Sequence, residues 1–517
     1  MSCLPRRRGP SWVARAGLLA ALGAAPNAAS AQPPSAAPGS ESPVEILDLA
    51  AYLRGEGSGL TSDDVARRAL ETAPSLDSAR AALRSARAGA ARAYLGFFPR
   101  FEITARYTRL SPVTNPSVGG ASITPDQEAL IRSLIGGVDD PEAATLFTAN
   151  LEAQLALATG FSFPVILDQY SVGASLSYPL SDVFLQVLPG YEAAERAVDA
   201  TESQLHARAS EIAQNAREAF YNLARARSAH AVAISTIATI EAQRRVVEAT
   251  VDAGLAARVD LMRLDAQLAS ARVAALRAEG GVASSEEAIR TLLHVGSEEP
   301  LPPGIAEDLL APLPALGESR EELFERAVAH RPEAESLRAL IAMRGRAIEA
   351  AEGSRYPHLA LAGTLSFDNP SPRVFPQQTR FIDIWAVSVV LSWSPNDFFT
   401  GELQAEEARA GRDTAEADLA ALEDGLRMQL TVAYENYRAA RAALDAAQLG
   451  IDAAEEAVRV RTETFRAGTG TITELMAATA DLARAQLDLV TAAIDARVAM
   501  TQIRRATGDD RAWELVD

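Results

Sequence analysis

Residues 60–110 read LTSDDVARRALETAPSLDSARAALRSARAGAARAYLGFFPRFEITARYTRL. A related stretch, residues 317–367, reads GESREELFERAVAHRPEAESLRALIAMRGRAIEAAEGSRYPHLALAGTLSF. The two copies align without a gap, because the second pair of prolines lies 258 positions after the first: Pro74 pairs with Pro332, and Pro99 with Pro357. In each copy a helical pattern ends at an aromatic–proline step, and an alternating pattern follows. A helix that leads into a strand, duplicated within one chain, is the feature that decides the fold.

Both copies begin with a helix-start signal at the same offset. Thr61 is followed three residues later by Asp64, and Ser319 by Glu322. Each pair fits a capping box, in which the hydroxyl and the carboxylate satisfy free backbone N–H groups. We therefore expect a helix to begin at each of these positions and to be interrupted near the following proline.

The first 31 residues have the layout of a secretory signal peptide. Four arginines precede an apolar run at residues 16–25, and Ala29-Ser30-Ala31 is a small-residue cleavage site. We expect cleavage after Ala31, which removes Cys3, the only cysteine of the chain. The mature chain then has no disulfide and no cysteine for a lipid anchor. The Pro-, Ala- and Ser-rich segment that follows predicts a flexible leader over residues 32–59.

The charge of the chain is strongly negative. The formal net charge is −19, and every basic residue is an arginine. This balance argues against nucleic acid as a partner. After the signal no stretch reaches the ~18 consecutive apolar residues of a transmembrane helix. A soluble periplasmic protein or a β-barrel whose hydrophobicity is hidden in alternation remain as interpretations.

Four segments alternate with period two and predict strands with one apolar face: residues 101–108, 170–178, 359–367 and 385–393. Aromatic residues bound two of them. Tyr170 and Tyr178, like Trp385 and Trp393, are eight residues apart on one face, which is ~26 Å along a strand. That matches the lipid-facing band of an outer-membrane barrel with its aromatic girdles. The alternative is an ordinary antiparallel sheet packed on a layer of helices.

A long helical tract follows each second strand. Residues 191–252 contain no Pro and no Gly, with apolar residues every three to four positions, and a second helical tract runs over residues 401–466. About 60 residues correspond to ~90 Å of helix. Turns at Ala253-Gly254-Leu255 and Ala467-Gly468-Thr469 lead into returning helices that end near His294 and Ala506. The glycines suit left-handed helix caps, and the alanine-rich helices predict extended antiparallel coiled coils.

Three further segments complete the predicted organisation of the chain. Residues 300–316 form a Pro-rich linker between a first repeat, residues 60–299, and a second repeat, residues 317–508. The loop at residues 111–169 is far longer than its counterpart, and its pattern predicts a helical piece from Pro125 to Ala158. Residues 509–517 form a C-terminal tail.

The sequence contains no pattern that is typical of a catalytic, cofactor or metal site. The five histidines are scattered, and no H-E-x-x-H motif occurs. A phosphate loop of the Walker type needs a lysine, which the chain lacks. We therefore expect no enzyme activity, no catalytic residue, no cofactor and no metal.

The pattern instead favours a conduit made by several copies. One chain supplies four strands, whereas a closed membrane barrel needs about eight or more. Open strand edges do not occur in lipid, so other copies must complete the barrel. Each long helix pair would then extend from the barrel as one part of the wall of a tunnel.

The duplicated unit at residues 69–108 has further motifs around it. LSYPLSD at residues 176–182 is echoed by LSWSPND at 391–397, and AGLAARVDLMRLDAQLASA at 253–271 by AGTGTITELMAATADLARA at 467–485. In this order the motifs resemble the outer membrane efflux protein family, the TolC-like channels, over nearly all of the mature chain. The resemblance implies an α+β membrane protein: a homotrimer with four strands per chain in one shared β-barrel, continued by a long periplasmic α-helical barrel.

The resemblance also implies a function and partners. Such channels lie in the outer membrane, in contact with its lipid, and extend into the periplasm. They act as passive exit ducts of tripartite efflux pumps or type I secretion systems. Their partners are a periplasmic adaptor (membrane fusion) protein at the helical tip and an inner-membrane transporter of the RND or ABC type. A gate at the tip opens by an iris-like untwisting of helices.

Site residues carried over from the family fall into three groups. The expected tip and adaptor contacts are Gly254, Leu255, Val259, Asp260, Leu261, Gly468, Thr469, Ile472 and Leu475. Glu474 is the expected gate residue; a second acidic position, three residues later, is Ala477 here, so a double acidic ring is not expected. The expected aromatic residues at the membrane interfaces are Phe97, Phe98, Tyr170, Tyr178, Tyr356, Trp385 and Trp393.

Two other interpretations remain open at this stage. A periplasmic adaptor or scaffold built from helical hairpins would explain the long helices, but it needs no lipid-facing aromatic pairs. For Glu474, the alternative to a gate is a solvated carboxylate at the start of a helix, where the helix dipole favours it. The sequence does not identify the cargo.

Overall fold

The computed structural model describes residues 48–55, 59–112, 125–137, 140–158, 166–254, 256–375 and 377–515. The expected signal peptide, its cleavage site after Ala31, Cys3, most of the expected leader and Leu255 of the first turn lie outside the described residues. Among the described helices, none combines the length and the apolar character needed to cross a membrane.

The same order of elements occurs twice along the chain: two short helices, two strands, one very long helix and one returning helix. The helices are α1 (Leu49–Arg54), α2 (Ser62–Thr72), α3 (Pro74–Tyr94), α4 (Pro125–Ile135), α5 (Pro141–Ala158), α6 (Leu188–Asp252), α7 (Arg258–Leu292), α8 (Arg320–His330), α9 (Pro332–Gly353), α10 (Pro395–Arg466) and α11 (Ile472–Ala506). The strands are β1 (Gly59–Leu60), β2 (Arg100–Arg109), β3 (Asp168–Pro179), β4 (Gly304–Ile305), β5 (His358–Asn369) and β6 (Ile382–Ser392).

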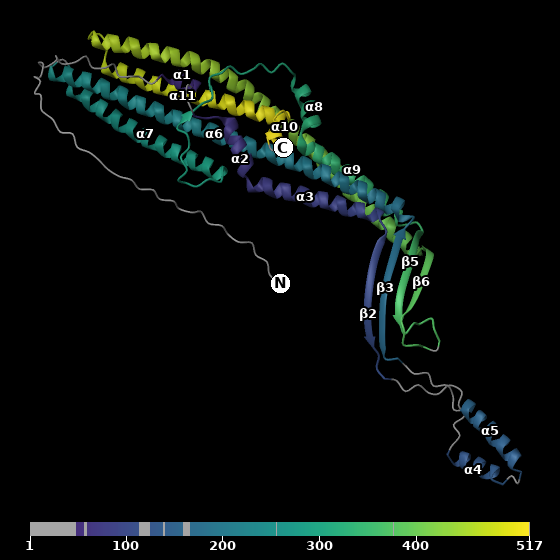
Figure 1. Cartoon of the computed structure of the whole chain (residues 1–517). Helices are drawn as coiled ribbons and strands as arrows, with labels where there is room; N and C mark the ends of the chain where they lie inside the picture. The colour runs from purple at the N-terminus through teal and green to yellow at the C-terminus, as the bar shows by residue number, and fades with distance from the viewer. Residues whose placement is uncertain are drawn as a thin grey trace, which may run out of the picture. The chain divides into compact units, whose positions relative to one another are not determined.

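The long helices pack side by side in one layer (Figure 1). Helix α6 packs on α7 and α11 over one part of its length and on α3 and α9 over the other part. Helix α10 packs on the other side of α11 and α9. The layer therefore has the order α3/α7, α6, α9/α11, α10. Its two edges are α3/α7 on one side and α10 on the other.

Small residues allow these helices to approach one another closely. Ala209, Ala213 and Ala216 of α6 are fully buried, as are Ala493 and Ala496 of α11. Because small side chains keep the backbones near each other, many weak dispersion contacts add up along the full helix length. The predicted extended antiparallel packing of alanine-rich helices is confirmed in α6–α7 and α10–α11.

The helix starts agree with the capping signals in the sequence. Ser319 and Glu322 form a full capping box at the start of α8. Thr61 accepts a hydrogen bond from the backbone N–H of Asp64, but the carboxylate of Asp64 accepts from the Thr61 hydroxyl, 2.7 Å away, rather than from a backbone N–H. The shorter Asp side chain explains the difference, because a capping box uses the longer reach of Glu or Gln.

The four longer strands form one antiparallel sheet in the order β2-β3-β5-β6. Residues that face each other across antiparallel strands lie on the same side of the sheet. Phe101 pairs with Leu176, Val172 with Phe367, and Leu365 with Trp385. The apolar sets predicted for the four separate strands therefore combine on a single face.

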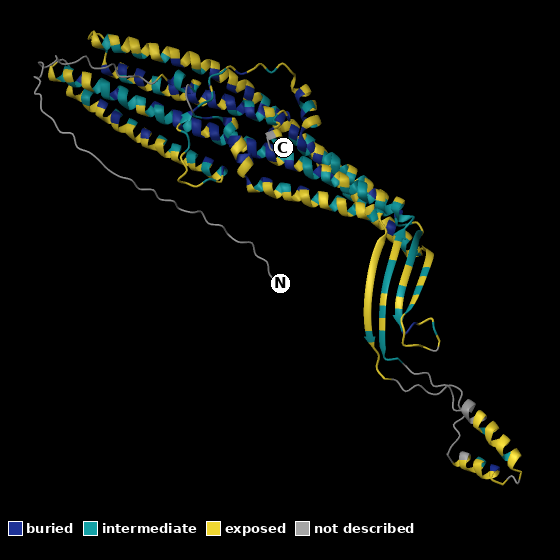
Figure 2. Ribbon diagram, viewed as in Figure 1, coloured by how far each residue is buried: buried dark blue, intermediate teal, exposed yellow. Residues whose placement is uncertain are grey.

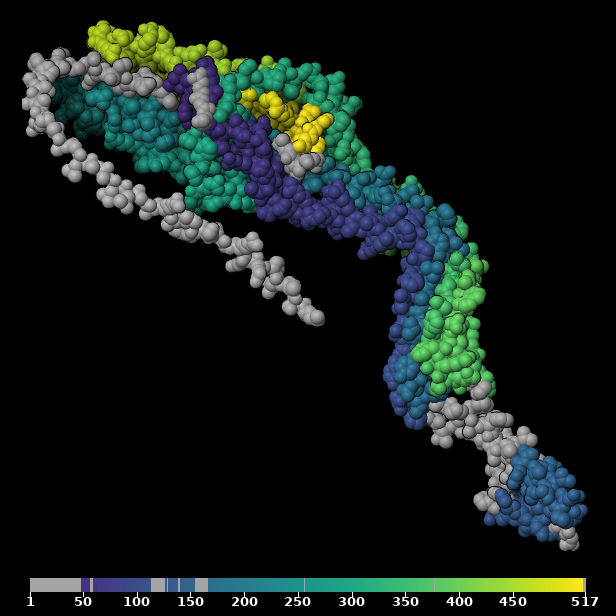
Figure 3. Space-filling model, in the orientation of Figure 1, coloured from purple at the N-terminus to yellow at the C-terminus, as the bar shows by residue number. Residues whose placement is uncertain are grey.

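Short segments lie across one face of the helix layer, and we call them the belt. The belt consists of α1, the β1–β4 pair, the rest of the 300–316 linker, α8 and the 3₁₀ turn Ala512–Leu515 (Figure 3). Buried arginines of the long helices bind its backbone: Arg227 donates to the Pro302 carbonyl at 2.8 Å, and Arg497 to the carbonyls of Leu309 and Ala311. The Tyr437 hydroxyl donates to the Pro314 carbonyl.

The belt contains parts of three segments outside the repeats. In the expected flexible leader, Leu49 and Leu53 are buried and Gly59–Leu60 forms strand β1. The Pro-rich linker packs on the long helices, and the tail contacts them through buried Ala512 and through Trp513, which stacks on His206 at 5.4 Å. Short apolar segments without a period carry little signal in a sequence, so their packing was not predictable.

The long loop between β2 and β3 contains two helices, α4 and α5, where one helical piece was expected. They contact each other. The break falls near Gly136-Gly137, since glycine is a weak helix former.

The two turns between long helices supply a first prediction. Gly254 and Gly468 have φ of 72° and 73°, a left-handed conformation that costs other residues about 1–2 kcal/mol. Changing both to alanine should loosen the turns, seen as faster amide hydrogen exchange there. Gly425→Ala, inside α10 with open space around its Cβ, is the matched control and should stabilise its helix by ~0.5–1 kcal/mol. Equal exchange in both variants would contradict the role of the turns.

Candidate functional site

The apolar face of the four-stranded sheet is uncovered. No residue of β2, β3, β5 or β6 is buried (Figure 2). Ile103 is 68% exposed and Trp385 70% exposed. Among the described residues no helix layer covers the sheet, so the alternative of a sheet packed on helices is not what the chain forms. A wide exposed apolar surface of this kind marks an interaction site.

The opposite face of the same sheet is polar. It carries Glu102, Thr104 and Arg106 on β2, which face Ser175, Gly173 and Ser171 on β3. At the end of the β2–β3 pair Arg109 and Asp168 form an ion pair at 2.7 Å. The sheet therefore has one apolar face and one polar face.

The predicted aromatic residues lie at different levels of the sheet. At the end of the sheet away from the long helices, where β2 ends and β3 begins, Tyr170 packs on Tyr107 with ring centroids 5.1 Å apart. At the helical end, Trp393 lies just beyond β6, and its Nε1 donates to the Arg355 carbonyl at 3.2 Å. Tyr356 and Phe98 are exposed there.

Two of the expected interface aromatics, Phe97 and Tyr178, are half-buried. Phe97 is half-buried and contacts Tyr94 and Tyr191, with centroids 5.8 Å from each. Tyr178 is half-buried opposite Leu361. The sequence alone did not predict that Tyr94, Tyr107 and Tyr191 contact these aromatic residues. For Tyr94, its closeness in sequence to Phe97 and Phe98 could have indicated an aromatic cluster.

The register shows how the two aromatic pairs are arranged. Trp385 faces Leu365, which faces Ala174. Ala174 is thus level with Trp385, and Tyr170 lies four residues before Ala174 in β3. The Tyr170 and Trp385 levels therefore differ by ~13 Å along the strand. The two pairs do not form straight rows across the strands.

The tip of the helix layer joins both hairpins through a small apolar core. Partly buried Phe465 of α10 packs against this core. The buried residues of the core come from α6, α7 and α11: Ile240, Val247, Leu264, Leu268, Ile472 and Leu475. Of the residues expected to face a partner or to pack at the tip, Ile472 and Leu475 thus pack inside it. They hold α11 against the α6–α7 hairpin.

The other expected tip residues lie nearer the surface. Val259 and Thr469 are exposed, Leu261 is half-buried, and Gly254 and Gly468 occupy the turns. Asp260 forms an ion pair with Arg263 at 3.2 Å. These positions leave a surface of the tip available for contact.

Glu474 has a structural role at the start of α11. Its carboxylate accepts from the Thr471 N–H at 3.4 Å, completing a capping box. It also pairs with Arg461 at 3.3 Å, with both side chains about half exposed. A capping box contributes about 0.5–2 kcal/mol, whereas an exposed pair contributes little.

The described residues contain no cluster of three or more side chains that could hold a metal ion. Their notable features are therefore surfaces: a two-faced sheet, a helix layer with two edges, and a tip.

The comparisons with known proteins agree with this architecture. The model of the family described as outer membrane efflux protein matches residues 65–294 and 323–509. The chain belongs to the outer membrane efflux protein family. Membership places the protein in the outer membrane, with a periplasmic extension, and its general function is efflux transport. It favours a channel over the adaptor interpretation.

Solved structures share the fold. The outer-membrane channel OprN is 18% identical, with a TM-score of 0.64 over 92% of this chain and 99% of that one. CusC is 14% identical, with a TM-score of 0.65 over 91% and 99%. The open state of the MtrE channel of Neisseria gonorrhoeae is 18% identical, with a TM-score of 0.65 over 86% and 88%. No single curated protein sequence gave a significant match.

The difference between packed and exposed tip residues leads to a second prediction. Leu475→Ala removes a side chain that is 3% exposed, and such a truncation costs about 2–5 kcal/mol. Val259→Ala, at an exposed position of the same tip, should change stability by no more than ~0.5 kcal/mol. Hydrogen exchange over the first turns of α7 and α11 measures both. If Val259→Ala loosened the tip as much as Leu475→Ala, the assigned packing would be wrong.

Proposed function

We propose that this protein is a passive exit duct, assembled from three copies, for a tripartite efflux pump or a type I secretion system. The observation that carries the proposal is the uncovered apolar face of the sheet, which lipid would cover. The polar face would then line the aqueous interior of a β-barrel that the copies share.

The edges of the sheet explain why several copies are needed. Within the described residues, β2 and β6 each have a neighbouring strand on one side only. Unpaired backbone groups are too costly in lipid, so the β6 edge of one copy must pair with the β2 edge of the next. Three copies give a barrel of twelve strands, within the range of known outer-membrane barrels.

The helix layer has matching edges. Strand β2 follows α3, which lies on the α3/α7 edge, and β6 leads into α10, which forms the other edge. Exposed apolar residues lie on both: Leu276 on α7 and Leu449 on α10. Head-to-tail contact between these unlike edges closes a ring. A single rotation from one copy to the next would therefore pair the strand edges and also bring the helix edges into contact.

The belt indicates which side of the helix layer faces the duct. One face of the layer is occupied by belt segments held by Arg227, Tyr437 and Arg497. An open passage needs an unobstructed wall, so the uncovered face would line it. The belt would surround the tube.

Strand tilt accounts for the arrangement of the aromatic pairs. Strands β3 and β6 are two strands apart, ~10 Å across the sheet, and the Trp385 pair is shifted by ~13 Å along the strand relative to the Tyr170 pair. Barrel strands tilt by ~35–45°, which displaces points of equal depth by ~7–10 Å along the strand over that spacing, most of the ~13 Å shift. Tyr170 and Trp385 would then lie at one interface, and Tyr178 and Trp393 at the other, near Phe97, Phe98 and Tyr356.

The tip is the proposed contact for a periplasmic adaptor that links the duct to an inner-membrane transporter of the RND or ABC type. Exposed Val259 and Thr469 offer that contact, with Asp260 and Leu261 beside them. Glu474 is proposed to contribute to a gate. Its capping role means that opening by movement of α11 would carry the carboxylate with the helix.

Reconstitution in planar bilayers tests the duct. The full-length protein purified from outer membranes should give stepwise single-channel currents. Val387→Arg places a charge on the apolar face, which costs about 2–4 kcal/mol at the bilayer midplane, and should prevent membrane assembly. Ser388→Arg, on the polar face next to it, is the matched control and should still conduct. A wild-type protein that stays monomeric without detergent and never conducts would refute the proposal.

Cross-linking tests the arrangement of the copies. Leu276 and Leu449 each lie about 17–18 residues from the tip, or ~27 Å along their helices. In the double variant Leu276→Cys, Leu449→Cys, a flexible bismaleimide should link copies into covalent dimers and trimers on a denaturing gel. Either single variant should not cross-link, since unlike edges meet in the ring. Efficient linkage in a single variant would show a two-fold arrangement instead.

A further inference from the structure

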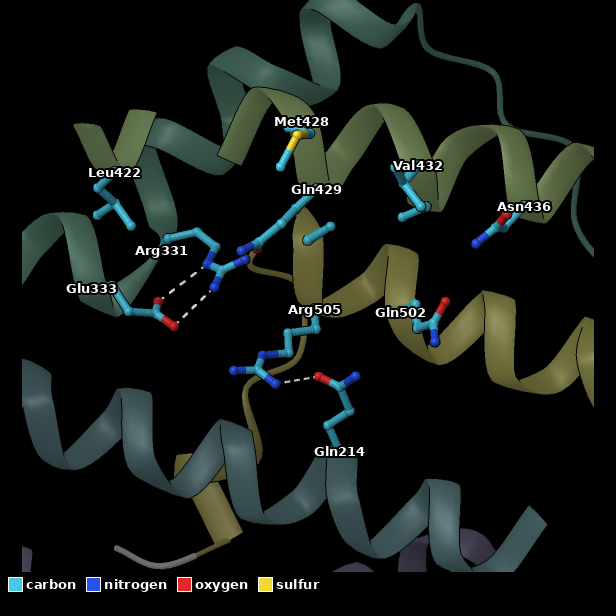
Figure 4. A pocket seen from close by; sticks show the side chains of 12 residues that line it. Gln214, Arg331, Glu333, Leu422, Met428, Gln429, Val432, Asn436, Gln502 and Arg505 are labelled. Carbon is cyan, nitrogen blue, oxygen red and sulfur yellow. Dashed lines mark hydrogen bonds and ion pairs between the residues drawn. The ribbon is translucent and has the colours of Figure 1, made fainter. Parts of the chain in front are cut away.

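A recess of about 630 Å³ lies where α11 ends and α9 begins (Figure 4). Its walls come from α6, α10, α11 and the start of α9. The volume lies within the range of small-molecule sites, ~300–1,000 Å³. Neither the family nor the duct architecture requires a hollow at this point of the wall.

The recess opens on the face of the layer that the belt leaves free. On α10, Tyr437 binds the belt, whereas Met428 lines the recess. Nine residues separate them, which is about two and a half helical turns, so they point in opposite directions. On the proposed function, on which this inference rests, the recess therefore opens into the duct.

The cations in the recess outnumber the carboxylates. Buried Arg331 binds Glu333 through two hydrogen bonds of 2.8 and 3.1 Å. Burial alone would raise the pKa of Glu333, but Arg331, with Arg505 nearby, holds it below its usual value. That pair is neutral overall, and both groups remain charged.

Arg505 supplies the remaining positive charge. Its described side-chain partner is the neutral carboxamide of Gln214, and no ion pair of Arg505 occurs among the described residues. Gln214 in turn donates to Glu218 at 2.7 Å, so a carboxamide separates Arg505 from that carboxylate. Figure 4 shows the Arg505 side chain directed toward Gln214 across the recess. The guanidinium keeps further donors for a ligand.

Apolar groups complete the lining. Met428 and Val432 of α10 line the wall opposite these polar groups, beside Leu422. A guanidinium binds carboxylates and sulfonates through charge-assisted hydrogen bonds, while methionine adapts to irregular apolar shapes. A ligand that satisfies both walls carries one anionic head and an apolar body.

We propose that this recess is a binding subsite in the duct wall for small amphipathic organic anions, with Arg505 as the anion-binding residue. The chain as a whole is acidic, with a net charge of −19, so most of its surface offers an anion no attraction. A local cationic site gives such compounds a point of retention along the passage. Small amphipathic organic anions are therefore one chemical class of cargo that we expect the duct to carry.

Calorimetric titration tests the site, using the assembled full-length channel in lipid nanodiscs. The probe is naphthalene-2-sulfonate, and 2-naphthylmethylammonium is its cationic counterpart. The wild type should bind the sulfonate and not the ammonium. Arg505→Gln should weaken sulfonate binding at least about tenfold, as expected for loss of a charge-assisted contact. Arg504→Gln, a neighbouring arginine on the belt side, should bind like the wild type.

A second pair of variants leaves the Arg505–Gln214 contact intact. Met428→Glu adds a carboxylate at an exposed position of the wall and should reduce sulfonate binding, whereas Met428→Gln should not. Absence of sulfonate binding by the wild type, or equal binding by Arg505→Gln and Arg504→Gln, overturns the proposal. Binding without conductance in planar bilayers would leave the site intact and refute the duct. Conductance without sulfonate binding would support the duct and refute the binding site.

Discussion

Unpaired backbone hydrogen-bonding groups at the edges of one sheet are the constraint on which the rest of the structure depends. Strands β2 and β6 each present a free edge, and the sheet between them presents an apolar face. In an outer membrane these two facts are incompatible with a single chain, because lipid offers no partner for a peptide N–H or C=O. The helix layer also has two unlike edges, in the same order as the two edges of the sheet. The α3/α7 and α10 edges continue the two strand edges, so in the proposed assembly the same contact between copies would close both the barrel and the helical tube.

Much of the fold could be predicted because its signals are periodic. Alternation located all four strands within a few residues, and the cross-strand register placed their apolar sets on one face. Apolar residues at helical spacing located the long helices, the first of which also lacks Pro and Gly over residues 191–252, and the glycines at 254 and 468 located the turns. Helix α10 nevertheless begins at Pro395, several residues before the expected start, since proline is accepted in the first helical turn.

The sequence was less informative where a role depends on residues far apart in the chain. In the sequence alone, Ile472 and Leu475 are compatible with either a docking surface or a buried core. The structure shows that they belong to a core, because the α6–α7 hairpin packs on them. The recess unites Gln214 with Arg505, 291 positions apart, and no local pattern marks either. The belt lacks periodicity altogether. Its contacts are hydrogen bonds from side chains to backbone carbonyls, which any residue can offer, so the accepting segment carries no recognisable motif.

The contacts of α6 with the belt have a consequence for biogenesis. Tyr221 donates to Glu307, which also accepts from the Ser62 N–H, and Arg217 bridges Asp63 and Asp510. Burial raises the pKa of Tyr221, and the charge of Glu307 raises it further, so the phenol stays a hydrogen-bond donor. Residues from the start, the middle and the last ten positions of the chain thus converge on one helix. During synthesis this junction cannot be complete until Asp510 has been made, 293 positions after Arg217. The two arms of the junction, Asp63 and Asp510, therefore join the long helix at very different times.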